Sequence, residues 1–309
     1  MWQRHGLIPN KRHSQIPFVE KFSTHWRIYY NTRINNKGTP LCLDVEIENP
    51  SNVLEDNSSP LLHFGDLGSF DVNGIMVTDL IELNNTKAMY YIGWVQRRDV
   101  PFQNAVGIAF LNQKTNKWEK FSSGPIFNSS YKEPGTFCGV PRIIKNDIYK
   151  DRLLMFYTST TKWKNIEGSQ HAIYNLKYAF SDNGIDWEPA GTLIDLKRDE
   201  GGITSPTVIQ IKDVYLMWYS VRKIGCNRKT PENGYIIKCV KSKNLIDWTP
   251  VDILNLYPDP TSEWDNGMVC FPYVLEHKEK IYLFYSGNLF GSAGMGYAVM
   301  DAHLLSNII

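Results

Sequence analysis

The sequence lacks a hydrophobic run long enough to cross a bilayer, which takes roughly 18 apolar residues. Its N-terminal stretch, MWQRHGLIPNKRHSQIPFVEKF, has basic residues but lacks the apolar core of a signal peptide. We therefore expect a cytoplasmic protein with no membrane span.

An excess of charge of either sign is also missing. The 33 Lys and Arg residues balance 32 Asp and Glu residues, which gives a formal net charge of +1. Nucleic acids and anionic membrane surfaces bind strongly basic surfaces. The sequence therefore gives no electrostatic reason to expect either partner.

The motifs of metal and nucleotide sites are absent as well. The five cysteines are scattered without a C-x-x-C pair, and the seven histidines show no H-x-x-x-H pair. This pattern predicts buried free thiols and no zinc site. No phosphate-binding glycine loop of the P-loop or dinucleotide type is present. We expect no cofactor, and the sequence leaves a structural calcium ion open.

What the sequence does have is an internal repeat. An aromatic pair recurs in five short hydrophobic runs, and the steps between its aligned tyrosines are 61, 66, 62 and 66 residues. Aromatic and β-branched residues between polar or Gly/Pro-containing stretches are typical of β-strands. The aligned tyrosines are Tyr30, Tyr91, Tyr157, Tyr219 and Tyr285.

Each repeat unit contains further strand-like segments. A Pro- or Gly-opened strand is expected before the aromatic one at 74–83, 140–145, 205–211 and 271–277, and another strand after it at 105–111, 175–181, 235–242 and 295–300. Tryptophans at 118, 187 and 248 occupy an outermost strand, where packing between blades is the favoured role. Five units of four antiparallel strands, without helical periodicity, predict one all-β domain over residues 1–309, a five-bladed β-propeller.

Carboxylates recur just before the first strand of four units. The surroundings of Asp71 (SFDVNGIM) match those of Asp265 (EWDNGMV), and those of Glu133 match those of Glu200. In a propeller these positions lie at the mouth of the central channel. Glycosyl transfer needs carboxylates that lie close together, one protonated to assist the leaving group and one ionised. The alternative is that these acids only bond loop amides.

With these residues in view, the sequence resembles the five-bladed propeller superfamily of glycoside hydrolase families 43, 62, 32, 68 and 130. Closest are uncharacterised glycosyl-hydrolase-like proteins of bacterial surface-polysaccharide gene clusters. The likeness covers essentially the whole chain. The motifs that carry it are FDVNGIM, PFQNAVGIA, TKWKN, NLKYAFSDNGIDW, MWYSVR, WDNGMVCFPYV and YSGNLFGSAGMGYAV.

The resemblance implies roles for the acids. Asp71 would be base or nucleophile, Glu133 or Glu200 the general acid, and Asp265 a residue that orients a group or tunes a pKa. In the phosphorylases of family 130 cationic side chains hold phosphate, a role open to Arg97, Arg98, Arg142 and Arg222.

Other side chains are candidates for binding sugar hydroxyls or stacking on a sugar ring. Trp163, expected in a loop after the third aromatic strand, is the favoured stacking platform. The remaining substrate-binding candidates are Asn104, Lys162, Ser205 and Asn288.

Three functions follow from these expectations. The first is an enzyme that acts on a glycosidic bond of an oligosaccharide or activated-sugar intermediate of surface-glycan metabolism, with a small carbohydrate as its partner. The second is a carbohydrate-binding propeller without catalysis. The third is a phosphorylase or glycosyltransferase on the same fold, because a propeller does not determine function.

Overall fold

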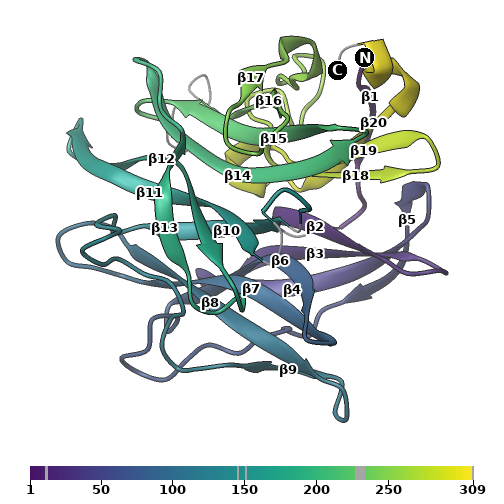
Figure 1. Cartoon of the computed structure of the whole chain (residues 1–309). Coiled ribbons are helices and arrows are strands. Elements are labelled where there is room, and N and C mark those ends of the chain that lie inside the picture. Colours follow the sequence, from purple (N-terminus) through teal and green to yellow (C-terminus); the bar gives the residue numbers. More distant parts are fainter. Residues whose placement is uncertain (11–12, 145, 150–151, 227–233, 308–309) are drawn as a thin grey trace. The chain divides into compact units, whose positions relative to one another are not determined.

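The computed structural model describes residues 1–10, 13–144, 146–149, 152–226 and 234–307, and it is almost entirely β (Figure 1). Its few helical turns are η2 (Asp252–Leu254), α1 (Asn288–Gly291) and η3 (Ala302–Asn307). The strands are β1 (Gln3–Leu7), β2 (Gln15–Lys21), β3 (Trp26–Ile34), β4 (Lys37–Glu46), β5 (Asn49–Asn57), β6 (Gly74–Leu83), β7 (Thr86–Val95), β8 (Gln103–Asn112), β9 (Lys117–Lys120), β10 (Cys138–Ile144), β11 (Leu153–Ile166), β12 (Ser169–Ser181), β13 (Glu188–Ile194), β14 (Glu200–Ile211), β15 (Val214–Lys223), β16 (Ile236–Ser242), β17 (Thr249–Pro250), β18 (Cys270–His277), β19 (Lys280–Ser286) and β20 (Met295–Asp301).

The strands form antiparallel sheets of four. Three sheets have the orders β2-β3-β4-β5, β6-β7-β8-β9 and β1-β20-β19-β18. A fourth, eight-stranded sheet contains β10–β13 and β14–β17, which are joined by one parallel residue pair, Tyr174 with Gly202. The expected five separate sheets therefore appear as four, because this pair merges two groups of four strands.

The tyrosine repeat marks the second strand of each group, as predicted. Its five members lie in β3, β7, β11, β15 and β19, and none is more than 7% exposed. Aromatic side chains bury a large apolar area, so a strand that carries one at a fixed place is fixed in its sheet.

The chain divides into two compact units. Unit 1 comprises residues 1–30, 42–58 and 205–309, and unit 2 comprises residues 31–41 and 59–204. Each has its own core. In unit 1 it is built around Trp218, Leu283 and Tyr285, and in unit 2 around Tyr90, Met155 and Tyr157.

A backbone irregularity recurs near the start of four first strands. Ile16, Val140, Ser205 and Phe271 each have a positive φ, between 48° and 57°, and each directly precedes a proline. A left-handed conformation is costly for side chains of this kind. In β10 and β18 the pairing register shifts across this point, so the irregularity bends the strand just beyond its start.

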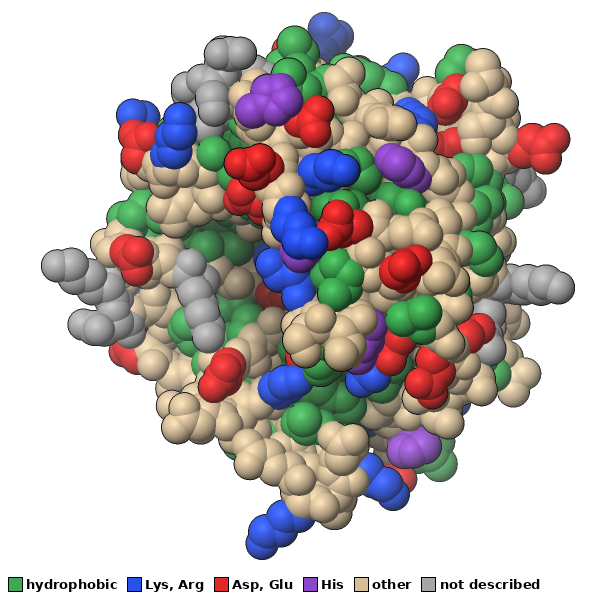
Figure 2. All heavy atoms as spheres, turned by 90° about the vertical axis from the view of Figure 1, so that its right-hand side faces the viewer, with side chains coloured by type: hydrophobic (Ala, Val, Ile, Leu, Met, Phe, Trp, Pro, Cys, Tyr) green, Lys and Arg blue, Asp and Glu red, His purple; other side chains and the backbone are tan. Residues whose placement is uncertain are grey.

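The surface carries charges of both signs, and the cysteines are buried. On the face shown in Figure 2, acidic and basic side chains are interspersed. All five cysteines are buried and free, as predicted. In the described part of the chain, no helix is long and apolar enough to span a membrane.

Candidate functional site

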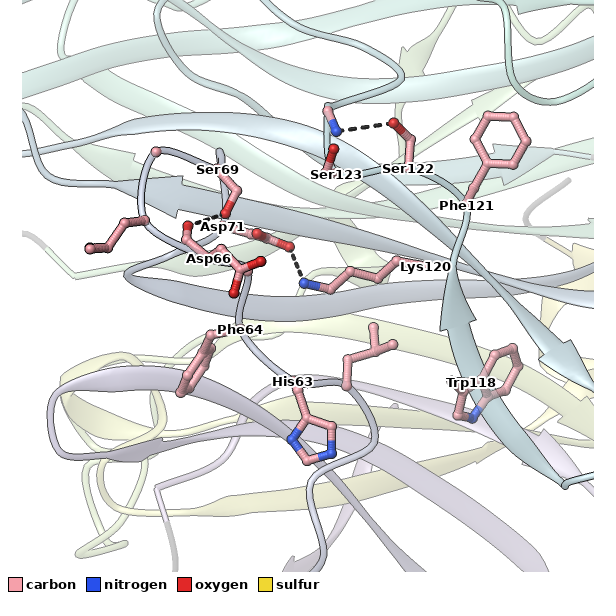
Figure 3. A pocket seen from close by; sticks show the side chains of 15 residues that line it. His63, Phe64, Asp66, Ser69, Asp71, Trp118, Lys120, Phe121, Ser122 and Ser123 are labelled. Carbon is pink, nitrogen blue, oxygen red and sulfur yellow. Dashed lines mark hydrogen bonds and ion pairs between the residues drawn. The ribbon is translucent and has the colours of Figure 1, made fainter.

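In unit 2, Asp71 lies in the turn before β6 and is only 1% exposed. Its Oδ2 atom accepts hydrogen bonds from Lys120 Nζ at 2.5 Å and from the Tyr91 hydroxyl at 3.4 Å. Figure 3 shows the Lys120 side chain extended toward this carboxylate. We call Asp71, Tyr91 and Lys120 the Asp71 triad.

Tight packing fixes the Asp71 triad. The Phe70 ring stacks on the Tyr91 ring with centroids 5.8 Å apart. A Cβ atom on Gly93 would lie 2.5 Å from Phe70 and 2.6 Å from the Cβ of Asp71. Only glycine at this place in β7 lets the turn lie so close to the sheet.

Unit 1 contains a second such triad. Asp265, also 1% exposed, accepts a hydrogen bond at Oδ2 from the Tyr285 hydroxyl at 2.9 Å and pairs there with the Arg4 guanidinium. The Trp264 ring stacks on Tyr285 at 5.1 Å. We call Asp265, Tyr285 and Arg4 the Asp265 triad.

The two triads occupy the same register in their sheets. Tyr91 pairs with Gly107 and Tyr285 with Gly296, a glycine of the third strand in each case. Two residues further along that third strand, the paired residue of the fourth strand is Lys120 in unit 2 and Arg4 in unit 1. Each unit therefore builds the same arrangement of aspartate, tyrosine and cation.

In both triads one carboxylate oxygen is left over. Asp265 Oδ1 is buried and has no hydrogen-bond partner among the described residues. Asp71 Oδ1 likewise accepts no hydrogen bond from the described part of the chain, and Asp71 lines a cleft of about 800 Å³. A buried charged oxygen without a partner is costly, so Asp265 Oδ1 is suited to a bound group that donates a hydrogen bond, and Asp71 Oδ1 can accept one from a group bound in the cleft.

Glu133 in unit 2 is held differently. Its Oε1 accepts hydrogen bonds from Ser159 at 2.6 Å and Lys177 at 2.9 Å, and its Oε2 from Tyr157 at 2.7 Å and Lys177 at 3.1 Å. Lys177 lies on β12 directly opposite Tyr157, the place that glycine occupies in the two triads. Both oxygens of this carboxylate are therefore occupied.

These contacts set the protonation of the groups. Burial raises the pKa of Glu133, but hydrogen bonds from Ser159, Lys177 and Tyr157 outweigh it, so the pKa lies below its usual value. Burial, followed by the neighbouring carboxylate, raises the pKa of Tyr91, Tyr157 and Tyr285. At neutral pH the tyrosines are donors and Glu133 is a carboxylate.

The fourth acid, Glu200, begins β14 in unit 2 and is 9% exposed. Its Oε2 accepts a hydrogen bond from the backbone N–H of Lys197 at 2.9 Å, as an acid that closes a turn does. Asp71, Glu133 and Glu200 thus belong to unit 2, and Asp265 belongs to unit 1.

Five candidates for substrate binding lie in unit 2. Asn104 is buried in β8, and its side-chain oxygen has no partner among the described residues. The sequence predicted a loop at Trp163, but the residue lies in β11. The β11–β12 hairpin continues to Ile166, and within it Trp163 pairs with Ala172. Its ring nitrogen donates to Thr136 at 2.8 Å. Lys162 and Arg98 are exposed.

Arg142, the fifth candidate of unit 2, is bound to another residue. Its guanidinium donates to Asp79 Oδ1 at 2.8 Å, and both side chains are buried. The backbone N–H groups of Ile143 and Leu80 also donate to Asp79. Burial raises the pKa of Asp79, and Arg142 opposes that rise. The pair joins β6 and β10.

The remaining candidates lie in unit 1. Ser205 is 1% exposed, and its hydroxyl has no partner among the described residues. Asn288 is occupied: its side chain accepts a hydrogen bond from Gly267 and donates to Glu263 and Asn266. The buried Arg222 donates to the carbonyl of Lys223 at 3.2 Å.

The sequence analysis named the acids as candidates but not the tyrosines and cations that hold them. The tyrosines served only to locate strands, and no local pattern marked Lys120, Lys177 or Arg4. Among the described residues, no group of three or more His, Cys, Asp or Glu side chains could hold a metal ion.

Sequence comparison finds distant relatives. No known protein-family profile matches the chain. Two uncharacterized proteins of Mycobacterium tuberculosis, MT1551 of strain CDC 1551 and Rv1502 of strain H37Rv, are each 26% identical over 300 residues, which cover 94% of this chain and 94% of the relative.

Comparison of structures gives a clearer relation. A solved glycoside hydrolase has a TM-score of 0.72 at 17% identity, over 97% of this chain and 91% of its own length. A thermostable family-43 glycoside hydrolase has a TM-score of 0.67 at 14% identity, over 96% and 92%. The protein has the fold of the propeller glycoside hydrolases. A structure from the GH130 family of mannoside phosphorylases and hydrolases shares this fold, with a TM-score of 0.66 at 14% identity over 94% of this chain and 85% of its own length.

Proposed function

We propose that this protein is a glycoside-acting enzyme and that Asp71 of unit 2 and Asp265 of unit 1 are each candidate carboxylates for its chemistry. In this proposal residues 1–309 form one domain, a five-bladed propeller, and the substrate is an oligosaccharide or activated-sugar intermediate of surface-glycan metabolism. The fold shared with glycoside hydrolases supports the class of reaction. The single observation that carries the assignment of residues is the free Oδ1 atom in each triad. A cytoplasmic location stays a prediction.

The triads suit carboxylate chemistry. A cation and a tyrosine hold Oδ2 of each aspartate, which fixes the orientation of the group and places a positive charge beside it. The other oxygen can accept a proton from water or stabilise the positive charge that develops on a sugar ring. Asn104 and Ser205, whose side-chain oxygens lack partners in the described structure, would bond sugar hydroxyls.

The general acid has a different requirement, because it must carry a proton at neutral pH. Glu133 does not fit this role, since its pKa is lowered and both of its oxygens are occupied. We therefore assign a structural role to Glu133, which leaves Glu200 as the candidate for the general acid.

The test is turnover by aspartate-to-asparagine variants. Against a panel of 4-nitrophenyl glycosides, Asp71→Asn and Asp265→Asn should each lower kcat by about 10²–10⁴-fold, the usual contribution of a general acid or base. Asp213→Asn, at an exposed ion pair with Lys243, is the matched control and should keep full activity. Normal turnover in both triad variants, with hydrolysis by the wild type, would exclude the assignment of residues.

A carbohydrate-binding protein without catalysis is the second candidate. The observation that favours it is that Asp71 and Asp265 are each paired with a cation and keep one oxygen free, and such a carboxylate is a good acceptor for sugar hydroxyls. Glycan binding without turnover of any glycoside would support this candidate.

Phosphorolysis is tested in the same assays. Arg142 is engaged by Asp79, Arg97 by Asp99 and Arg222 by the carbonyl of Lys223, so a phosphate site would depend on the exposed Arg98. Turnover that requires added phosphate would identify a phosphorylase, and turnover unchanged by phosphate a hydrolase.

A further inference from the structure

A cleft of about 800 Å³ opens beside the Asp71 triad within unit 2. One wall is the segment 62–69, which precedes β6, and the other is 118–124, which comprises the end of β9 and the turn after it. The Asp71 and Lys120 side chains meet between the two walls (Figure 3). This volume lies in the range of pockets that hold small ligands.

Aromatic rings border the cleft. Phe64 is 36% exposed, Trp118 is partly buried, and Lys37 Nζ lies 4.9 Å from the Phe64 ring centroid. Phe121 lines the cleft with its backbone end only: its ring rests edge-on against Phe110, with centroids 6.0 Å apart, and points away from Asp71 and Lys120 (Figure 3). Phe64 and Trp118 are therefore the aromatic rings that can offer apolar faces to a ligand.

Polar groups on the same walls have no partner. Among the described residues, none bonds the side chains of His63, Asp66 or Ser123. They supply a carboxylate, a hydroxyl and an imidazole at the rim, and Asp71 Oδ1 adds an acceptor at the floor. A ligand that both donates and accepts hydrogen bonds would satisfy this set.

The charges around the cleft are balanced. Lys120 and Asp71 neutralise each other, and the other carboxylate on the walls, Asp66, is offset by the Lys37 ammonium beside Phe64. The cleft therefore has no excess positive charge that would favour phosphates or uronates over a neutral ligand. A neutral sugar complements the groups of the cleft. Its C–H faces pack on aromatic rings, and its hydroxyls donate to carboxylates and accept from Ser123.

We propose that this cleft is a binding subsite for neutral oligosaccharides, with a sugar ring packed against Phe64 and Trp118 and hydroxyls bonded to Asp66, Ser123 and Asp71 Oδ1. The class of ligand rests on the proposed function, whereas the place of binding rests on the cleft itself.

The experiment is a glycan array with the full chain, followed by calorimetry with the best neutral glycan. The wild type should bind neutral glycans in preference to sialylated, uronate-containing or phosphorylated ones. The double variant Phe64→Ala/Trp118→Ala should raise Kd at least tenfold, and Ser123→Trp, which fills the cleft from an exposed position, should do the same. Tyr131→Ala removes a 91% exposed aromatic side chain outside the cleft and should leave Kd unchanged.

The outcomes separate this proposal from the proposed function. Binding lost in the cleft variants supports the subsite, even if no glycoside is turned over. Failure of every neutral glycan on the array to bind, a preference for anionic glycans, or wild-type Kd in the correctly folded Ser123→Trp variant would overturn it, even if Asp71→Asn abolishes turnover.

Discussion

The Nζ atom of Lys177 lies 2.9 Å from Oε1 and 3.1 Å from Oε2 of Glu133, so one ammonium group bridges both oxygens of a buried carboxylate. The Lys177 side chain is 18% exposed and that of Glu133 only 1%. The charge of Glu133 therefore depends on this lysine more than on water.

Lys177→Met should destabilise the protein by about 3 kcal/mol at pH 7, the lower end of the cost of removing one partner of a buried ion pair. Because the folded-state pKa of Glu133 is lowered, its contribution is present above the unfolded value near 4.3 and is lost as the pH falls through the folded pKa. The difference between wild type and variant should therefore shrink at acidic pH, as measured by urea unfolding. Lys132→Met, at an exposed pair with Glu188, is the control and should be silent. A difference that stays constant with pH would show that Lys177 does not act through the Glu133 charge.

The two triads differ in one distance, which predicts unequal effects. The tyrosine hydroxyl lies 2.9 Å from the carboxylate in the Asp265 triad and 3.4 Å in the Asp71 triad. Tyr285→Phe should cost about 2 kcal/mol, in the range of a hydrogen bond to a charged group. Tyr91→Phe should cost less, because a bond at the distance limit is weak. Urea unfolding at pH 7 compares the two, and equal losses would contradict the prediction.

The Asp79–Arg142 pair gives a double-mutant cycle. Arg142→Met should destabilise unit 2 by about 3–5 kcal/mol, because it leaves Asp79 buried without its cation. The pKa of Asp79, already raised by burial, should rise further, so the variant should lose stability as the pH rises through the acidic range. Asp79→Leu/Arg142→Met should recover most of the loss in urea unfolding, since a buried pair is replaced by apolar groups of similar size. Additive effects of the two single changes would rule out a direct pairwise interaction.

The repeat could be predicted from the sequence because each of these strands is marked by the residue types within its own short segment. Tyr30 and the four equivalent tyrosines lie within runs of aromatic and β-branched residues, and each occupies the second strand of its group. The four acids could be aligned for the same reason, since each precedes or begins a first strand. Local patterns were enough for these features.

The partners of the acids could not be predicted in this way. Arg4 and Asp265 are 261 residues apart in the sequence, and they meet only because β1 pairs with β20. Lys120 reaches Asp71 from a fourth strand, whereas Lys177 reaches Glu133 from a third strand. The type of residue recurs but its sequence position does not, so register, rather than spacing, creates these contacts.

Gly65 packs directly against the free Oδ1 atom of Asp71. A Cβ atom there would overlap both Asp71 Oδ1 and Ser69 Oγ, whereas one on Gly124, on the opposite wall of the cleft, would meet only Ser122 Oγ at 3.7 Å. Gly65→Ala should therefore displace the free oxygen of Asp71 and destabilise the protein by about 1–3 kcal/mol, as overpacking does. It should also lower kcat, because the displaced oxygen belongs to the proposed catalytic carboxylate. Gly124→Ala should stay within about 0.5 kcal/mol of wild type and keep the wild-type kcat. Thermal unfolding and glycoside turnover are measured on the same samples. A Gly65→Ala variant that loses stability but retains wild-type kcat would contradict the role of Asp71 Oδ1.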